Sequence, residues 1–162
     1  MHQRYLIALG SNVRHHRHGL PEAVLAAALT ELTQRGLTVL RAAPILRSAA
    51  VGPSLRRYAN GAALIETGLD PAALLAALKS IERGFGRRRG GQRWTSRVLD
   101  LDIVLWSGGP WASADLFVPH PLFRARQFVL KPAAAIAPDW RDPLTGLTLR
   151  QLAARLVRPA RA

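Results

Sequence analysis

The sequence predicts an α+β fold in which helices pack on an antiparallel sheet. Short apolar runs with strand spacing alternate with two long amphipathic runs, and proline, glycine or aspartate stands at most of the boundaries between them. The chain has 162 residues, of which 49% are hydrophobic, enough for one substantial core. We therefore expect residues 1–162 to form a single domain.

The first part of the chain contains a strand, a helix and a divided strand. Residues 4–12 are a short apolar run that ends at a glycine turn, which is typical of a buried strand. In residues 20–36, leucine and valine recur at helical spacing before a terminal glycine. Residues 37–48 favour another strand, interrupted or bent at Pro44. The Gly-Pro pair in 49–57 predicts a loop.

The second part repeats this order. Residues 58–67 favour a strand, and residues 68–86 favour a helix that begins with an aspartate N-cap and a proline. Residues 87–97 are rich in arginine and glycine and predict a loop. A strand that contains two aspartates follows at 98–106.

The resulting order is strand, helix, strand, strand, helix, strand. This is the order of a split βαβ, ferredoxin-like sandwich, with an antiparallel sheet and helices on one face. Further helices are predicted over 124–138 and within 145–162. No repeat or linker divides the chain.

The two aspartates are the strongest chemical signal. Because side chains alternate along a strand, Asp100 and Asp102 share a face, about 7 Å apart at their bases. The predicted faces are Val98, Asp100, Asp102 and Val104 on one side, and Leu99, Leu101, Ile103 and Leu105 in the core on the other. Paired carboxylates without histidine or cysteine favour two magnesium ions, about 3.5–4 Å apart. The alternative is a solvent-exposed face on which each carboxylate pairs with an arginine.

Arginine gathers in the loop that precedes this strand. The chain has only ten acidic residues, yet the loop carries five guanidinium groups. They belong to Arg87, Arg88, Arg89, Arg93 and Arg97. Arginine beside a carboxylate pair suits a polyphosphate with its magnesium. No Walker A sequence is present, so side chains rather than a backbone cradle would bind the phosphates.

Composition limits the class of protein further. The net charge of +13 favours an anionic partner, but all except two of the 23 basic residues are arginine, so a general compositional bias is an equal alternative. The absence of cysteine excludes disulfides and thiolate metal sites. No apolar run approaches the roughly 20 residues of a membrane span, and no signal peptide is recognised. We expect a cytoplasmic monomer without nucleic-acid or membrane partners.

Five segments resemble, in order, the 6-hydroxymethyl-7,8-dihydropterin pyrophosphokinase family of folate biosynthesis. They are "ALGSN" at 8–12, "YANGAALIET" at 58–67, "LLAALKSIERGFGR" at 74–87, "RWTSRVLDLDIVLW" at 93–106 and "VPHPLFRARQFVLKPAAAIAP" at 118–138. The resemblance implies a ferredoxin-like fold and transfer of the diphosphate of ATP to the hydroxymethyl group of the pterin, with release of AMP. It also implies ATP and 6-hydroxymethyl-7,8-dihydropterin as partners.

The resemblance assigns residues to the ATP side of the site. Asp100 and Asp102 would hold two magnesium ions, and Arg87 and Arg97 would act with them as catalytic residues. The expected ATP-binding residues are Lys79, Glu82, Arg89, Ile103, His120 and Arg126.

On the pterin side, Tyr58 and Phe128 match two residues that stack on the ring. Asn60 matches the residue that hydrogen-bonds to the edge of the ring. Ser48, Val51 and Trp94 complete the set, the last when the arginine loop closes. Two segments depart from the family: Ser48, Ala49 and Ala50 replace a Thr-x-Pro segment, and Thr95 and Ser96 replace Gly-Pro. Both departures affect loop geometry rather than chemistry.

Two other functions are compatible with parts of this pattern. A ferredoxin-like RNA-binding module would suit the charge, but only 6% of residues are aromatic and no strand interleaves them for base stacking. Another magnesium-dependent nucleotidyltransferase would use the aspartates but would not need Tyr58, Asn60 and Phe128 together. His15, His16 and His18 are expected to be solvated loop residues rather than metal ligands.

Overall fold

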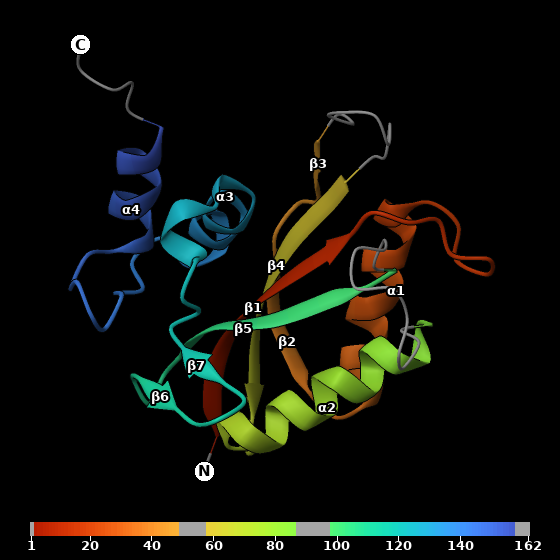
Figure 1. Cartoon of the computed structure of the whole chain (residues 1–162), viewed down its shortest axis with the longest axis horizontal. Helices are drawn as coiled ribbons and strands as arrows, with labels where there is room; N and C mark the ends of the chain where they lie inside the picture. Colours follow the sequence, from red (N-terminus) through yellow and green to blue (C-terminus); the bar gives the residue numbers. More distant parts are fainter. Residues whose placement is uncertain (1, 49–57, 87–97, 158–162) are drawn as a thin grey trace.

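The computed structural model describes residues 2–48, 58–86 and 98–157 (Figure 1). Five strands form an antiparallel sheet in the order β2-β4-β1-β5, and β3 extends it by pairing with β4. This order confirms the ferredoxin-like prediction. The strands are β1 (Gln3–Ser11), β2 (Thr38–Ala42), β3 (Leu46–Ser48), β4 (Tyr58–Thr67) and β5 (Asp100–Trp106).

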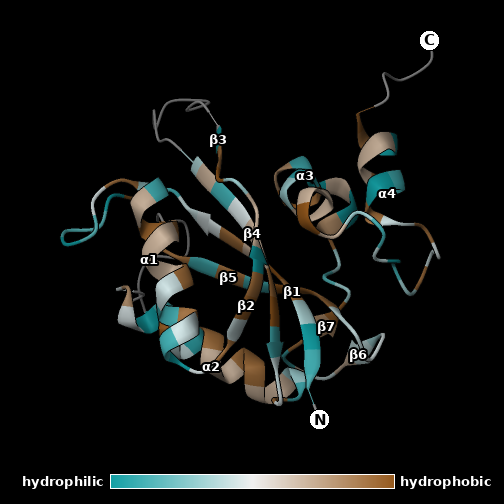
Figure 2. Ribbon diagram, turned by 180° about the vertical axis from the view of Figure 1, so that it is seen from behind, coloured by the Kyte–Doolittle hydropathy of each residue, from teal (hydrophilic) through white to brown (hydrophobic). Residues whose placement is uncertain are grey.

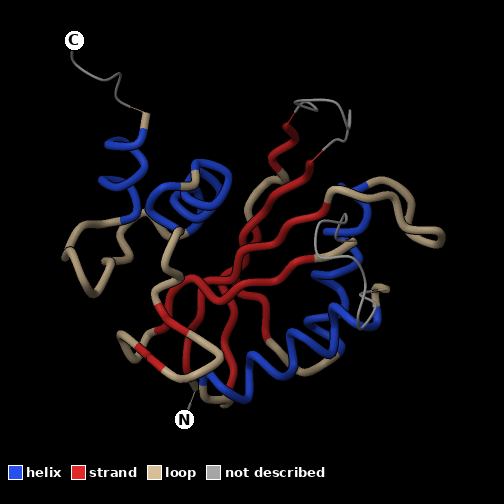
Figure 3. Tube along the Cα trace, viewed as in Figure 1, coloured by secondary structure: helices blue, strands red, loops and turns tan. Residues whose placement is uncertain are grey.

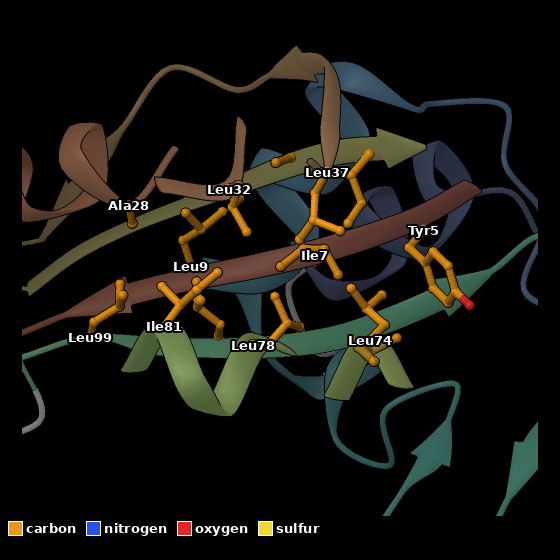
Figure 4. Close-up of a cluster of buried hydrophobic side chains, with 14 of the residues drawn as sticks. Tyr5, Ile7, Leu9, Ala28, Leu32, Leu37, Leu74, Leu78, Ile81 and Leu99 are labelled. Carbon is orange, nitrogen blue, oxygen red and sulfur yellow. The ribbon is translucent and has the colours of Figure 1, made fainter. Parts of the chain in front are cut away.

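Two helices cover one face of the sheet, α1 (Pro21–Gln34) and α2 (Pro71–Gly84). The first turn of α2 is capped as predicted, because the Asp70 carboxylate accepts a hydrogen bond from the backbone N–H of Ala73 at 2.8 Å. Apolar residues three or four apart on each helix point at the strands. Figure 4 shows Leu74 and Leu78 of α2 packed against Ile7 of β1.

The chain after β5 returns across the opposite face of the sheet. It forms the helices α3 (Gln127–Ile136) and α4 (Leu149–Leu156), and α3 packs on the strands with α4 beside it (Figures 1 and 2). A second core joins Leu130 of α3 to Leu6 of β1 and Leu105 of β5. Helices therefore cover parts of both faces, whereas the sequence predicted one face, because the apolar side of α3 also needs a surface on which to bury.

A β-bulge in β5 changes the predicted faces of this strand. Ile103 pairs with Ile7 and Leu105 pairs with Leu6, so one extra residue lies between the two pairs on β5. Leu105 therefore turns to the α3 side, and its predicted place beside Leu101 and Ile103 was wrong. Val98, before the strand begins, also packs against the core of α1 and α2 rather than on the aspartate side.

The segment between β5 and α3 contains structure that the sequence did not predict. A small hairpin joins β6 (Trp111–Ala112) to β7 (Phe117–Val118), and a 3-10 turn, η1 (Phe123–Ala125), follows. The helix predicted over 124–138 begins only at Gln127, because the residue before it has an extended backbone. Among the described residues, no helix is both long and apolar enough to cross a membrane.

Candidate functional site

Tyr58, Asn60 and Asp100 lie at one end of the sheet, where β1 ends and β4 and β5 begin; Figure 3 shows these strand ends side by side. Gly10 of β1 pairs with Asn60 of β4 on one side and with Asp100 of β5 on the other. Residues that pair directly across strands share a face, so these three form one row. The row brings a predicted pterin-binding amide and a predicted metal-binding carboxylate to the same level of the same face.

A second row of small residues lies next to the first. Ala8 pairs with both Ala62 and Asp102. Glycine and alanine therefore form the floor between β4 and β5. The alanine row packs against the core under α3, where Ala62 is 3% exposed, and the glycine row lies nearer the end of the sheet. A Cβ atom at Gly10 would lie 3.4 Å from Oδ1 of Asn60, so a larger side chain here would crowd the amide. The sequence analysis did not assign these small residues a role, although their alternation in "ALGSN" was a usable signal.

Two predicted pterin-binding residues are exposed aromatic side chains. Tyr58 lies at the start of β4, two residues before Asn60, and is 39% exposed. Phe128 lies in the first turn of α3 and is 44% exposed. Large aromatic residues that belong to a core are normally buried. The exposure of both rings favours binding of a ligand over the alternative of core packing.

Both aspartates are half-buried on the floor side of β5, and each has polar or charged contacts. Glu82, in the last turn of α2, holds the residue between them. Its Oε2 atom accepts a hydrogen bond from the backbone N–H of Leu101 at 2.8 Å, and only 2% of Glu82 is exposed. The carboxylate of Glu82 thus fixes the strand that carries Asp100 and Asp102.

Two other predicted ATP-binding residues, Lys79 and Ile103, lie on α2 and β5 and differ in exposure. Lys79 is exposed on α2. The side chain of Ile103 is buried in the core beneath α1 and α2, so it faces away from the aspartates. The N–H of Leu101 points to the outer edge of β5, and backbone alternation places the N–H of Ile103 on the same edge. Contact between Ile103 and a nucleotide would therefore use the backbone.

His120 is held with a defined tautomer. Its backbone N–H donates to the carbonyl of Val104 at 3.1 Å, and its Nδ1 atom accepts from the backbone N–H of Leu122 at 3.2 Å. In the neutral ring the proton is therefore on Nε2. Burial lowers the pKa of His120, and Arg126 lowers the pKa further, while Asp100 has the opposite effect. The imidazole is a neutral hydrogen-bond donor that lies within the electrostatic reach of both Arg126 and Asp100.

Arg126 precedes α3, and its guanidinium lies over the ring of Phe128, 5.7 Å from the ring centroid. This contact joins a predicted ATP-binding residue to a predicted pterin-binding residue. A cation over an aromatic face also holds the ring in place. The contact therefore joins one residue predicted for each half of the site.

Several predicted residues lie outside the part of the chain that the structure describes. They are Val51, Arg87, Arg89, Trp94 and Arg97. For Ser48 the description covers only the backbone, which pairs with Tyr58 at the end of β3. Their predicted roles stay predictions.

The loop histidines were expected to be solvated, and for His15 this was wrong. Only 8% of His15 is exposed, and its ring lies 5.9 Å from that of Phe85. Its Nδ1 atom accepts from the backbone N–H groups of Arg17 and His18, at 3.0 and 3.1 Å. His15 thus closes a turn, which sequence spacing does not reveal.

The donor set at the aspartates fits magnesium. Among the described residues, no group of three or more histidine, cysteine, aspartate or glutamate side chains could enclose a metal ion. Magnesium does not need such a cage, because it keeps several waters and takes its remaining ligands from one or two carboxylates and substrate phosphates. Asp100 and Asp102 provide two carboxylates on one open face, which is this type of site.

Comparisons with known proteins show the family of this chain. Residues 6–138 match the model of the 7,8-dihydro-6-hydroxymethylpterin-pyrophosphokinase (HPPK) family. A 2-amino-4-hydroxy-6-hydroxymethyldihydropteridine pyrophosphokinase from Synechocystis is 39% identical over 91% of this chain and 73% of its own length. The protein of the same name from Pseudomonas aeruginosa is 40% identical over 88% of this chain and 86% of its own length.

The fold has a solved counterpart. The crystal structure of a Plasmodium falciparum HPPK-DHPS triple mutant with SDX-DHP superimposes with a TM-score of 0.74 at 13% sequence identity. The match covers 97% of this chain and 44% of that longer chain, so it supports the fold alone. The family match and the two bacterial relatives establish the remaining point: this chain belongs to the 7,8-dihydro-6-hydroxymethylpterin-pyrophosphokinase family.

Proposed function

We propose that this end of the sheet binds 6-hydroxymethyl-7,8-dihydropterin and ATP side by side, and that the chain transfers the diphosphate of ATP to the hydroxymethyl group. The products are AMP and the pterin diphosphate, and the reaction belongs to folate biosynthesis. Membership in the family supports the activity. The row Asn60–Gly10–Asp100 is the observation that carries the assignment of the site.

The row fits the pterin. Strands β4 and β5 lie on either side of β1, so Asn60 and Asp100 are about 9–10 Å apart across the sheet. We propose that a two-ring heterocycle lies across the glycine row between them, at the end of the floor. The Asn60 amide offers both a donor and an acceptor to the edge of the ring. We propose that Tyr58 and Phe128 stack on the ring and that the hydroxymethyl group points toward Asp100.

The opposite side of the floor suits the triphosphate. Asp100 and Asp102 would hold two magnesium ions, which when bound neutralise phosphate charge and lower the pKa of the acceptor hydroxyl. His120 donates from Nε2 to a phosphate oxygen, and Arg126 supplies a charged donor nearby. Arg87, Arg89 and Arg97 are proposed to bind phosphates as well. Lys79, Glu82 and Ile103 stay predictions as ATP contacts.

We propose direct in-line transfer without a covalent enzyme intermediate. No cysteine is present in the chain, and the row offers no activated serine as a nucleophile. Catalysis would come from position and electrostatics: the floor and Asn60 orient the acceptor, and the basic groups stabilise charge on the phosphates. Trp94, Ser48 and Val51 are proposed to complete the pterin pocket.

The test measures AMP formation from magnesium–ATP with and without hydroxymethyldihydropterin. We expect AMP to form only in the presence of the pterin, and to be lost in Asn60→Ala as well as in the double variant Asp100→Ala/Asp102→Ala. Pterin-independent release of AMP would indicate a different nucleotidyl- or diphosphotransferase. Full activity of either variant would refute the assignment of the site.

The location, the oligomeric state and the absence of nucleic-acid and membrane partners are also proposals. The protein is proposed to act as a cytoplasmic monomer that does not bind nucleic acid or membranes. Three of the most exposed large apolar side chains, Leu20, Phe117 and Leu144, are far apart in the sequence, which supports a monomer. Light scattering measures the mass, and RNA binding that persists at high salt would contradict the proposal.

A further inference from the structure

A buried ion pair lies beside the phosphate side of the site. Arg124 donates from Nε to Oδ2 of Asp142 at 2.6 Å and from Nη2 to Oδ1 at 2.8 Å. Asp142 is fully buried, and Arg124 is largely so. Desolvation of two charges is costly, so even a well-formed buried pair often contributes no more stability than apolar residues of similar volume. Its two hydrogen bonds nevertheless fix where the guanidinium lies.

The carboxylate of Asp142 is fixed by its own loop. It also accepts from the backbone N–H of Leu144 at 3.0 Å and from the hydroxyl of Thr145 at 2.8 Å. The backbone of Asp142 donates to the carbonyl of Leu147 and accepts from the N–H of Gly146, both at 2.8 Å. These contacts hold the carboxylate in one place, and Arg124 is the group that it positions. Burial alone would raise the pKa of Asp142, but the hydrogen bonds from Arg124, Leu144 and Thr145, together with the charge of Arg124, lower the pKa below its usual value.

Arg124 lies in the middle of the segment that carries two phosphate-side residues, His120 and Arg126. The backbone of this segment forms a single 3-10 turn: the N–H groups of Phe123, Ala125 and Arg126 reach the carbonyls three residues earlier at 3.2, 3.2 and 3.4 Å. Two side chains add further anchors. The side chain of Phe123 is fully buried in the core under α3, and the guanidinium of Arg124 lies 4.7 Å from the centroid of that ring and binds Asp142.

We propose that Asp142, acting through Arg124, is a positioning residue for the binding of ATP. The pair sets the rotation of the 3-10 turn η1, and that rotation sets the direction in which Arg126 and His120 face the phosphates. The proposal rests on the ATP-side roles in the proposed function. Asp142 itself contacts no substrate, because it is fully buried on the far side of Arg124.

The first test is Asp142→Asn, which keeps the shape of the side chain and removes its charge. We expect the KM for magnesium–ATP to rise about tenfold, with kcat reduced less than threefold and the Kd of hydroxymethyldihydropterin within twofold of the wild-type value. The matched control is Asp139→Asn. Asp139 forms an ion pair with Arg150 at 3.4 Å in the same part of the chain, but both side chains are exposed, so no change in KM is expected.

A second variant distinguishes an effect on the position of the phosphate-side residues from an effect on the stability of the folded protein. The double change Arg124→Leu/Asp142→Leu removes both charges, which often leaves stability nearly unchanged, whereas loss of one partner leaves a buried charge. We expect this variant to fold with a wild-type unfolding midpoint and still to bind ATP about tenfold more weakly. Arg124→Lys keeps the positive charge but not the two paired hydrogen bonds. Its affinity for ATP should lie between those of the wild-type protein and the double variant.

Two results would overturn the proposal. One is a stable double variant with wild-type KM for ATP. The other is an equal loss of ATP and pterin binding in Asp142→Asn, which would indicate general damage to the site. Failure of the proposed function is seen separately, because the wild-type protein would then form no AMP in the presence of the pterin.

Discussion

The contact between Glu82 and the aspartate strand can be tested by the change Glu82→Gln. The buried carboxylate accepts the N–H of Leu101 at 2.8 Å. A hydrogen bond to a charged group contributes about 1.5–3 kcal/mol, and a neutral one about 0.5–1.5 kcal/mol. For this hydrogen bond alone, replacing the charged acceptor by an amide should therefore cost about 1–2 kcal/mol. In a protein of this size each kcal/mol lowers Tm by about 2–4 °C, so Tm should fall by about 2–8 °C.

The same change should weaken the function. Leu101 lies between Asp100 and Asp102, so a looser strand places both carboxylates less well. We expect the concentration of magnesium–ATP needed for half-maximal AMP formation to rise about tenfold, which corresponds to about 1.4 kcal/mol. Calorimetry measures Tm. A titration with magnesium–ATP at saturating pterin measures the concentration needed for half-maximal AMP formation.

A matched control uses the same substitution at Glu31. Its Oε1 atom accepts from Arg35 Nε, also at 2.8 Å, but the pair lies on the exposed side of α1. Such a pair contributes about 0.3–0.5 kcal/mol, so Glu31→Gln should lower Tm by less than about 2 °C. If Glu82→Gln behaves like this control in both assays, the carboxylate does not hold the strand and the reasoning is refuted.

Three other predictions concern the site itself. Asp102→Asn should reduce AMP formation about a hundredfold or more at every magnesium concentration, because loss of a metal ligand removes several kcal/mol of charge stabilisation; a threefold effect would argue against the metal site. Tyr58→Ala should raise the KM for the pterin about tenfold with little change in Tm, because the ring is already partly exposed; an unchanged KM would exclude stacking. The folded state lowers the pKa of His120, mainly by burial, so the unfolded state binds the proton more readily and stability should fall as pH drops below about 6.5. Urea unfolding at pH 5.5 and 7.5 should show a smaller loss for His120→Gln, and an identical loss would contradict a half-buried neutral ring. His15 has a lowered pKa for the same reason, so part of the loss should persist.

Much of the fold was predictable because the signals are local. Asp70 and Pro71 mark the start of α2, and the structure begins the helix at that proline. Pro44 predicted the interruption between β2 and β3, and the two strands are separate. The hairpin β6–β7 and the turn η1 were missed, since strands of two residues and a single 3-10 turn carry almost no periodicity.

The sequence alone was enough to predict the chemistry of the site. It identified Asp100 and Asp102 as a pair on one face, and it identified Asn60, Tyr58 and Phe128 through the resemblance of their segments to one family. Residue types and spacings of two along a strand are written in the chain itself, because alternation is a property of the extended backbone. These inferences needed no knowledge of which strands are neighbours.

Only the tertiary structure decided which of these residues meet. The pairing of Gly10 with both Asn60 and Asp100 depends on strand order and register, which join positions 50 and 90 residues apart in the chain. The bulge that turns Leu105 to the other face depends on the same pairing, as does the contact of Glu82 with Leu101. Long-range register is set by how the whole core packs, and no local pattern encodes it.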